Sequence, residues 1–367
     1  SSAHSGSIYS EIVELSSNEL KTGFYPKTRH LYTLLMANIG NMYGPDFTFL
    51  GIPRCDLDKP ETYKGADVII VGAPIDSGTS YRSGAKMGPQ AIRMGDYLPH
   101  DAERPHLSMR IDPLQKLKIY DAGDLLMPGG DLVSSLKVLE EATEKISKAG
   151  AIAVVLGGDH SIASADVTGI ANHLGKGKVS MIHFDAHADT GEDQFGALIG
   201  HGTPMRRLIE SGAVRGDRFL QLGLRGYWPD DATLKWMAGK GMKSYEMTEI
   251  HHRGMKAVLD ESFAILTDGC DGVFLSVDID VVDPGMAPGT GTPEPGGMTS
   301  RELLEAVRRI CFELPIVGID VVEVAPAYDS SDITAILANR VVLEALSAIA
   351  LKKAGGTYSA TRNLLDR

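Results

Sequence analysis

Three short segments of the chain carry carboxylates and imidazoles at spacings that suit metal binding. They are a Gly-Gly-Asp-His pattern over 157–160, an Asp-x-His-x-Asp pattern over 185–189 and an Asp-x-Asp pattern over 278–280. Side chains two residues apart in extended backbone point the same way, so the members of each pattern converge. The candidate metal ligands are therefore His160, Asp185, His187, Asp189, Asp278 and Asp280.

The charge of this set indicates which ions it would hold. A single aspartate at a strand end is more simply explained as a turn or cap, but convergent carboxylates repel one another unless cations lie between them. The four candidate aspartates offset two divalent cations. Mixed carboxylate and imidazole ligands without thiolate suit Mn²⁺, while Ni²⁺, Co²⁺ or Fe²⁺ can replace it. We predict two divalent ions per chain, with Mn²⁺ favoured and Ni²⁺ as the alternative.

The segments that must position these residues are predicted to be buried parallel strands. Continuous β-branched apolar runs are typical of strands buried on both faces. Seven such runs occur, at 68–71, 117–120, 152–156, 179–182, 219–222, 273–277 and 316–319, with helical patterns at 132–146, 300–312 and 333–350. The alternation predicts an α/β fold, a three-layer α/β/α sandwich with a mainly parallel central sheet. Ligands bind at the carboxyl ends of strands in such sheets, where the polar motifs stand.

The chain divides into a core and two flanking segments. Residues 67–355 are predicted to form the catalytic domain, and 356–367 a C-terminal tail. Residues 1–66 are loop-rich, with a helix expected around Arg29 to Met42 and an extended, partly apolar stretch over 44–53. This extension is too short for its own core, so we expect it to pack on the main domain or on a neighbouring subunit.

Composition excludes several classes of protein. A formal net charge of −12 argues against a nucleic-acid partner and suits a cationic substrate, although acidic surfaces also serve solubility. The apolar helix 333–350 contains Arg340 and Glu344, which favours a buried helix over a membrane span. Three widely spaced cysteines and the absence of a signal peptide at the start of this sequence predict a cytoplasmic protein without disulfides.

The three motifs resemble the signatures of the ureohydrolase (arginase and agmatinase) family, which releases urea from guanidino compounds. Stretches at 72–93, 201–204 and 289–293 are similar as well, and the resemblance covers about 66–350. It implies an arginase-like fold with a binuclear centre. One ion would be held by His160, Asp185, Asp189 and Asp278. The other would be held by His187, Asp185, Asp278 and Asp280, so that Asp185 and Asp278 bridge.

The resemblance also implies His201, Asp280 and Glu323 as catalytic residues. A metal pair lowers the pKa of bound water and so supplies a nucleophile at neutral pH. Asp280 would accept a hydrogen bond from that nucleophile, His201 would deliver a proton to the departing nitrogen, and Glu323 would hold the guanidinium. Thr292, in a Gly-Thr-Gly-Thr-Pro stretch, joins Glu323 and His201 in the predicted substrate-binding set.

The substrate branch is read from the loop at 190–201. This loop lacks the Asn- and Ser-rich pattern with which arginases recognise the amino-acid end, so arginine is disfavoured. The His-Gly-Thr-Pro stretch followed by Arg206 and Arg207 resembles the agmatinase and guanidino-acid branch. The long N-terminal extension also resembles nickel-dependent guanidine and biguanide (metformin-type) hydrolases, which stay open as an alternative. Family resemblance implies a trimer or hexamer, as a homo-oligomer or with a second type of subunit.

Two rival interpretations remain. A zinc deacetylase of the same fold would use one metal and a tandem histidine pair. A non-catalytic partner subunit of a hetero-oligomer would usually have lost ligands. The tandem pair here, His251-His252, precedes a glycine and is predicted to lie in a surface loop.

Four other residues near the motifs are given structural roles. His183 is predicted to be a packed neighbour of the metal site, and Asp283 to form a turn with Pro284. Tyr227 and Trp228 follow a strand, so either could line the mouth of the site or pack in the scaffold.

Overall fold

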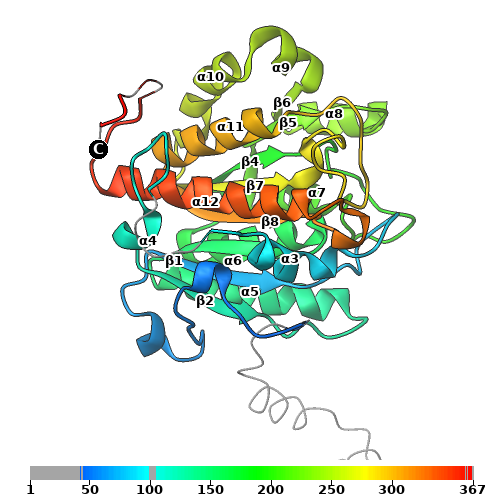
Figure 1. Cartoon of the computed structure of the whole chain (residues 1–367). Helices are drawn as coiled ribbons and strands as arrows, with labels where there is room; N and C mark the ends of the chain where they lie inside the picture. The colour runs from blue at the N-terminus through cyan, green and yellow to red at the C-terminus, as the bar shows by residue number, and fades with distance from the viewer. Residues whose placement is uncertain (1–41, 43, 99–104, 360, 362, 366–367) are drawn as a thin grey trace, which may run out of the picture. The chain divides into compact units, whose positions relative to one another are not determined.

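The computed structural model describes residues 42, 44–98, 105–359, 361 and 363–365. The helix predicted around 29–42 lies outside these residues, apart from Met42. Eight strands form one sheet (Figure 1). They are β1 (Val68–Ala73), β2 (Ile119–Asp124), β3 (Ile152–Gly157), β4 (Val179–Phe184), β5 (Val214–Leu224), β6 (Lys243–Glu246), β7 (Gly272–Asp278) and β8 (Ile316–Val322).

The sheet has the order β2-β1-β3-β8-β7-β4-β5-β6, and every pairing among the described strands is parallel. The predicted α/β sandwich is thus confirmed, with a sheet that is wholly rather than mainly parallel. The sequence reading missed β6, an edge strand in which only Tyr245 is buried. Strand β2 begins two residues later than predicted, because Leu117 caps the end of the short helix α4 (Pro113–Lys116), and it runs on to Asp124, which is the register partner of Gly72 in β1. Asp121 and Asp124 form ion pairs with the buried Arg93.

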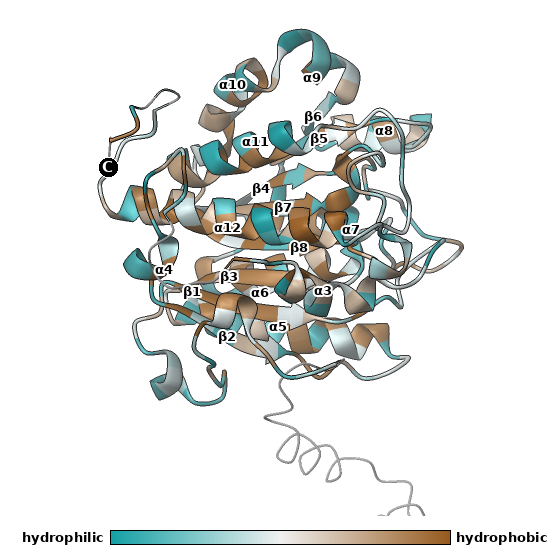
Figure 2. Cartoon of the chain, in the orientation of Figure 1, coloured by the Kyte–Doolittle hydropathy of each residue, from teal (hydrophilic) through white to brown (hydrophobic). Residues whose placement is uncertain are grey.

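Helices cover both faces of the sheet and create two apolar cores. The longer helices are α3 (Gly88–Met94), α5 (Leu132–Lys148), α6 (Ala163–Leu174), α7 (Pro204–Ser211), α8 (Asp231–Gly239), α9 (Met247–Arg253), α10 (Met255–Thr267), α11 (Ser300–Glu313) and α12 (Ile333–Lys353). Alternate residues of β1 face opposite layers: Ile70 packs in the core with α11 and α12, and Ile69 in the core with α5 and α6. In Figure 2, the strands and the helix surfaces that face them are largely hydrophobic.

The segment at 44–66 lies along strand β2. Phe49 is fully buried, and its backbone N–H donates to Asp121 Oδ2 at 2.8 Å. The backbone N–H of Cys55 donates to the carbonyl oxygen of Asp121 at 3.0 Å. The same carboxylate of Asp121 also receives Arg93, so one buried aspartate ties this segment and α3 to the sheet.

Helix α12 is the one helix, among the residues described, that is long and apolar enough to cross a membrane. In the structure, 72% of its apolar stretch is buried inside the protein. Its buried residues include Asn339, whose side chain donates to the carbonyl oxygen of Ile92. The helix is therefore the core helix that its polar residues predicted.

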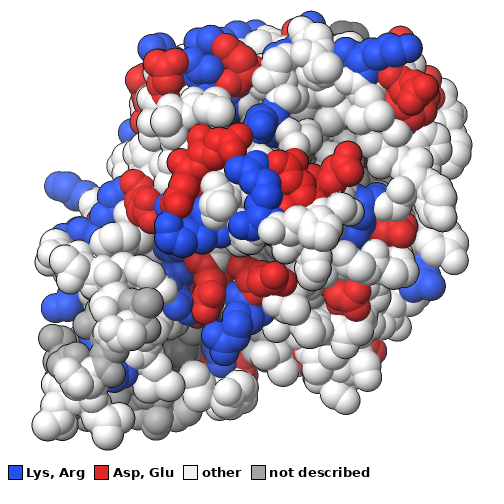
Figure 3. Space-filling model, turned by 90° about the horizontal axis from the view of Figure 1, so that it is seen from above, with Lys and Arg blue, Asp and Glu red and all other residues white. Residues whose placement is uncertain are grey.

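On the face shown in Figure 3, basic and acidic side chains are interspersed.

Candidate metal centre

The three motifs and Glu323 meet at one edge of the sheet. Strands β3, β8, β7 and β4 are consecutive neighbours at its centre, and the candidate residues stand at or just after their carboxyl ends. His160 follows β3, Asp185 follows β4, Asp278 ends β7 and Glu323 follows β8. Parallel strands bring their carboxyl ends to the same edge, so residues 163 positions apart become neighbours: the backbone N–H of His160 donates to Glu323 Oε1 at 2.8 Å.

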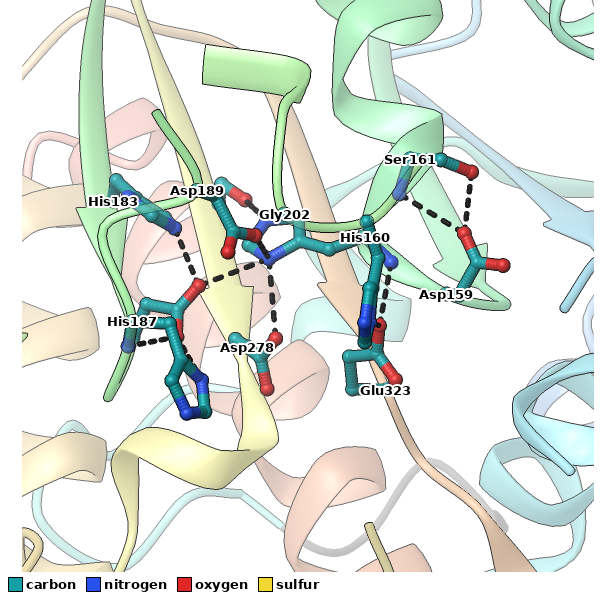
Figure 4. Close-up of polar contacts among 12 residues, drawn as sticks. Asp159, His160, Ser161, His183, His187, Asp189, Gly202, Asp278 and Glu323 are labelled. Carbon is teal, nitrogen blue, oxygen red and sulfur yellow. Dashed lines mark hydrogen bonds and ion pairs between the residues drawn. The ribbon is translucent and has the colours of Figure 1, made fainter. Parts of the chain in front are cut away.

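A first group of donors surrounds the His160 ring. Its Nδ1 lies 3.1 Å from a carboxylate oxygen of each of Asp185, Asp189 and Asp278 (Figure 4). His160 and Asp185 are each 1% exposed. These are the four residues predicted to hold one ion, and the structure brings all of them together.

A second group stands beside it and shares one member. His187 Nδ1 lies 3.0 Å from Asp280 Oδ2 and 3.4 Å from Asp185 Oδ1. Asp185 therefore directs one oxygen toward each group. Asp278 directs its Oδ2 toward His160 of the first group, while its Oδ1 accepts the backbone N–H of Asp280, a member of the second group, at 2.8 Å. The bridging role of Asp278 stays a prediction.

Hydrogen bonds behind His160 indicate that a cation fits between these donors. Its Nε2 donates to Ser276 Oγ at 2.9 Å, and that hydroxyl donates to Asp320 Oδ1 at 2.8 Å. Ser276 and Asp320 are register partners across β7 and β8. A ring whose Nε2–H is engaged in this way can offer its Nδ1 lone pair to a cation among the three carboxylates, which is how metal-ligating histidines are oriented. The sequence reading missed both residues; polar residues inside apolar strands were the available signal.

The electrostatics of Asp278 and Asp280 agree with this conclusion, whereas the neighbouring His183, His160 and His187 outweigh burial and hold the pKa of Asp185 well below its usual range. Burial and then the neighbouring Asp280 and Asp185 raise the pKa of Asp278 well above its usual range. Burial, followed by Asp185, also raises the pKa of Asp280. Carboxylates driven toward protonation in this way gain most from a bound cation. The donor chemistry, imidazole and carboxylate without thiolate, fits a divalent transition metal.

His183 contributes more than packing, which corrects the sequence reading. It is fully buried, and its Nε2 lies 2.8 Å from Asp185 Oδ2. Its Nδ1 faces the Gln221 side-chain nitrogen at 3.1 Å, and that nitrogen also donates to the carbonyl of Ala188. His183 Nδ1 is thus the acceptor, so Nε2–H donates to Asp185 and orients it. The signal was His183 standing two residues before Asp185, on the same side of an extended chain.

His201 and Glu323 form a pair beside the first group. His201 Nδ1 lies 2.9 Å from Glu323 Oε1, and the backbone N–H of Ser80 donates to His201 Nε2 at 2.9 Å. Burial alone would lower the pKa of His201, but the Glu323 carboxylate outweighs it and raises the pKa to about 9. An amide that donates to Nε2 nevertheless requires a lone pair there. The Ser80 hydroxyl lies 2.5 Å from the same nitrogen and can accept its proton, so Ser80 has a partner for both the neutral and the protonated ring.

Glu323 keeps one carboxylate oxygen free. The residue is 1% exposed, yet its Oε2 has no hydrogen-bond partner among the described residues. Burial would raise the pKa of Glu323, but the His201 ring and the His160 backbone N–H hold it below its ordinary value. Its backbone is left-handed, with φ of +62°, a strained conformation that is tolerated mostly at functional sites. The result is a buried, ionised carboxylate with one oxygen that no described residue engages.

A pocket of about 540 Å³ opens over these groups. Its lining includes His187, Asp189, Asp278, His201 and Thr292. Thr292 Oγ1 lies 3.4 Å from Asp280 Oδ2, so the predicted substrate-binding threonine does face the second group. 

Of the aromatic and histidine residues near the motifs, some line the pocket and others lie away from it. Trp228 lines the pocket, whereas Tyr227 is 98% exposed and does not. His251 and His252 lie in the last turn of helix α9 and not in a loop, and both are exposed. The carboxylate of Asp283 accepts backbone N–H groups of a turn.

Comparison with known proteins gives a consistent result. The model of the arginase family matches residues 66–348. Proclavaminate amidinohydrolase from Streptomyces clavuligerus is 36% identical over 84% of this chain and 95% of its own length. Guanidinopropionase from Pseudomonas aeruginosa is 37% identical, covering 82% of this chain and 93% of that one. A crystal structure described as a hypothetical agmatinase from Burkholderia thailandensis superimposes with a TM-score of 0.74 at 35% identity, covering 86% of this chain and 94% of that one.

Proposed function

Because the chain belongs to the arginase family, we propose that it hydrolyses a small guanidino compound to urea and an amine. One observation carries the proposal: a buried carboxylate oxygen of Glu323 has no partner among the described residues, and the other oxygen contacts His201, which lines the pocket beside two donor groups that share Asp185. A guanidinium is planar, cationic and rich in N–H donors, which is what a free, desolvated carboxylate oxygen binds best.

Two divalent cations would be held by the two groups. His160, Asp185, Asp189 and Asp278 would ligate one, and His187, Asp185, Asp278 and Asp280 the other. A metal pair supplies an activated water at neutral pH. We propose Mn²⁺ as the native ion and Ni²⁺ as the alternative, since both accept imidazole and carboxylate ligands.

The residues of the chain would bind and orient the substrate. Glu323 Oε2 would accept N–H groups of the guanidinium, while its Oε1 stays engaged by His201 and the His160 backbone. This fixes the plane of the carboxylate and therefore the position of the guanidinium carbon. Thr292 and Asp280 face the same space from the side of the second group. Asp280 would accept a hydrogen bond from the attacking water.

His201 would handle the proton of the leaving nitrogen. Its Nδ1 is anchored to Glu323, so its Nε2 is the atom that exchanges protons with the pocket. The Ser80 amide now occupies that atom, and Ser80 is an exposed residue on the pocket wall. A small movement of Ser80 would free Nε2 to carry a proton to the departing amine.

The test is urea release by protein reconstituted with Mn²⁺ or Ni²⁺, with agmatine, 4-guanidinobutyrate, guanidine, a dimethylbiguanide and arginine as substrates. Urea from one of them, lost in Asp185→Asn and kept in the exposed matched control Asp271→Asn, would support the proposal. Two bound metals without urea would contradict this substrate class. Neither metal nor urea would indicate a non-catalytic partner subunit. Metformin-type activity would appear as urea from the biguanide with Ni²⁺.

We further propose a cytoplasmic homo-oligomer, a trimer or hexamer. All three cysteines are free in the structure, as expected for a reducing compartment. Light scattering of the purified protein gives its mass directly, and a monomer would contradict the oligomer.

A further inference from the structure

On the basis of the proposed function, we infer that the pocket selects a guanidino substrate whose other end is an amine or amidine, and not a carboxylate. The relatives leave this open, since their names include both guanidino acids and agmatine. The residues of the pocket wall outside the two donor groups indicate which of the two kinds of substrate tail, cationic or carboxylate, the pocket binds.

A carboxylate is fixed on that wall. Asp193 lines the pocket and is exposed to it. One of its oxygens, Oδ1, accepts the backbone N–H of Gly196 at 2.8 Å, while Oδ2 has no hydrogen-bond partner among the described residues. An ammonium or amidinium would gain a charge-assisted hydrogen bond there, whereas a substrate carboxylate would be repelled.

The loop that carries Asp193 is anchored on both sides of the pocket. The side-chain nitrogen of Gln194 donates to the carbonyl oxygen of Gly78 at 2.8 Å, and its oxygen accepts the backbone N–H of Gly202 at 2.9 Å. Residues 194 and 197 also form a small antiparallel bridge. The carboxylate is thus held at the pocket by its own neighbour in sequence, next to the segment that leads into His201.

Two aromatic side chains complete this part of the wall. Phe195 and Trp228 both line the pocket, and they are 91% and 70% exposed. Large aromatic rings left open to a pocket, beside a carboxylate, form the surface that attracts organic cations through their π faces.

The arginine side chains near the pocket contact other protein groups. No lysine or arginine is among the described residues that line the pocket. Four arginines stand on segments that border it. Arg82 stacks between Tyr81 and Tyr328, and Arg206 lies over Trp236 and near Glu192. Arg207 donates to the carbonyl oxygen of Glu192 and pairs with Glu210, and Arg225 donates to five backbone carbonyls. None of these arginines is among the described residues that line the pocket.

The test compares substrates that differ at the tail. Agmatine ends in an ammonium, 4-guanidinobutyrate ends in a carboxylate, and guanidine has no tail. We expect the wild-type kcat/KM to be at least about tenfold higher for agmatine or a biguanide than for 4-guanidinobutyrate, as one charge-assisted contact predicts. Asp193→Lys should reverse this order of kcat/KM between the two tailed substrates. Glu61→Lys, an exposed site outside the pocket lining, makes the same change of charge and should keep the order.

A second readout is independent of turnover. Calorimetry should show that 1,4-diaminobutane binds the metal-loaded protein more tightly than 4-aminobutyrate, and that Asp193→Lys removes this difference. Urea release with a preference for 4-guanidinobutyrate would overturn the inference and leave the proposed function standing. Absence of urea from every substrate would instead refute the proposed function, and equal binding of the two probes would then overturn the inference as well.

Discussion

Replacement of Glu323 by glutamine tests the most specific feature of the site. The substitution keeps the shape of the side chain and removes its charge. The free Oε2 then no longer offers an ionised acceptor to the guanidinium. A hydrogen bond to a charged group contributes about 1.5–3 kcal/mol, so kcat/KM should fall about 10- to 150-fold for each bond lost.

The same variant should change the pH dependence of stability. The pKa of His201 is about 9 when it faces the Glu323 carboxylate, and glutamine should return it toward its ordinary value. A histidine whose pKa is higher in the folded than in the unfolded protein increases the free energy of unfolding. This contribution is complete at a pH below the unfolded-state pKa, and it is lost as the pH rises through the folded-state pKa. The deficit of Glu323→Gln relative to wild type should therefore be largest near pH 6 and shrink by an amount on the order of a few kcal/mol toward pH 9.5.

The assays are urea release for kcat/KM and urea-denaturation curves at the two pH values, the latter on protein held in a chelator. Glu261→Gln, an exposed carboxylate between Lys243 and Arg253, is the matched control. A stability deficit that is equal at both pH values would refute the assigned coupling of His201 to Glu323. An unchanged kcat/KM would refute the role of Oε2.

Three further substitutions test other parts of the structure. Asp185→Asn should remove both metals together, because Asp185 belongs to both groups, and loss of only one ion by elemental analysis would contradict this. His183→Phe should weaken metal affinity about 10- to 100-fold by freeing Asp185 to rotate, as measured by titration with Mn²⁺. Arg93→Met should lower the free energy of unfolding by about 3–5 kcal/mol, because two buried carboxylates lose their partner; a loss below about 1 kcal/mol in denaturant unfolding would show that the ion pairs contribute little.

The sequence was most informative where a polar motif directly follows an apolar run, because such a run predicts a strand and the motif then lies at the strand's carboxyl end. The motifs at 157–160, 185–189 and 278–280 follow apolar runs, so their meeting at one sheet edge could be predicted. The strand order could not be predicted, because it depends on packing between distant segments. Edge strand β6 escaped detection since its sequence, Lys243 to Glu246, has little apolar character.

Within the site, spacing along the chain identified donors but not their hydrogen-bond roles. Whether His183 packs, ligates or donates is decided by Gln221, which comes from another strand. The same holds for Ser80, whose contact with His201 joins residues 121 positions apart. His251 and His252 were misplaced because a glycine after them suggested a loop, whereas it ends a helix.

The position of β8 in the sheet has a consequence for how the protein is made. This strand, residues 316–322, lies between β3 and β7, which carry His160 and Asp278. The ribosome therefore releases every metal donor before the strand that joins the two halves of the sheet has been synthesised. The complete donor set can assemble only after about nine-tenths of the chain has emerged, since contacts so distant in sequence form late. We therefore expect a nascent or truncated chain that lacks β8 not to hold His160 beside Asp278 as the complete sheet does.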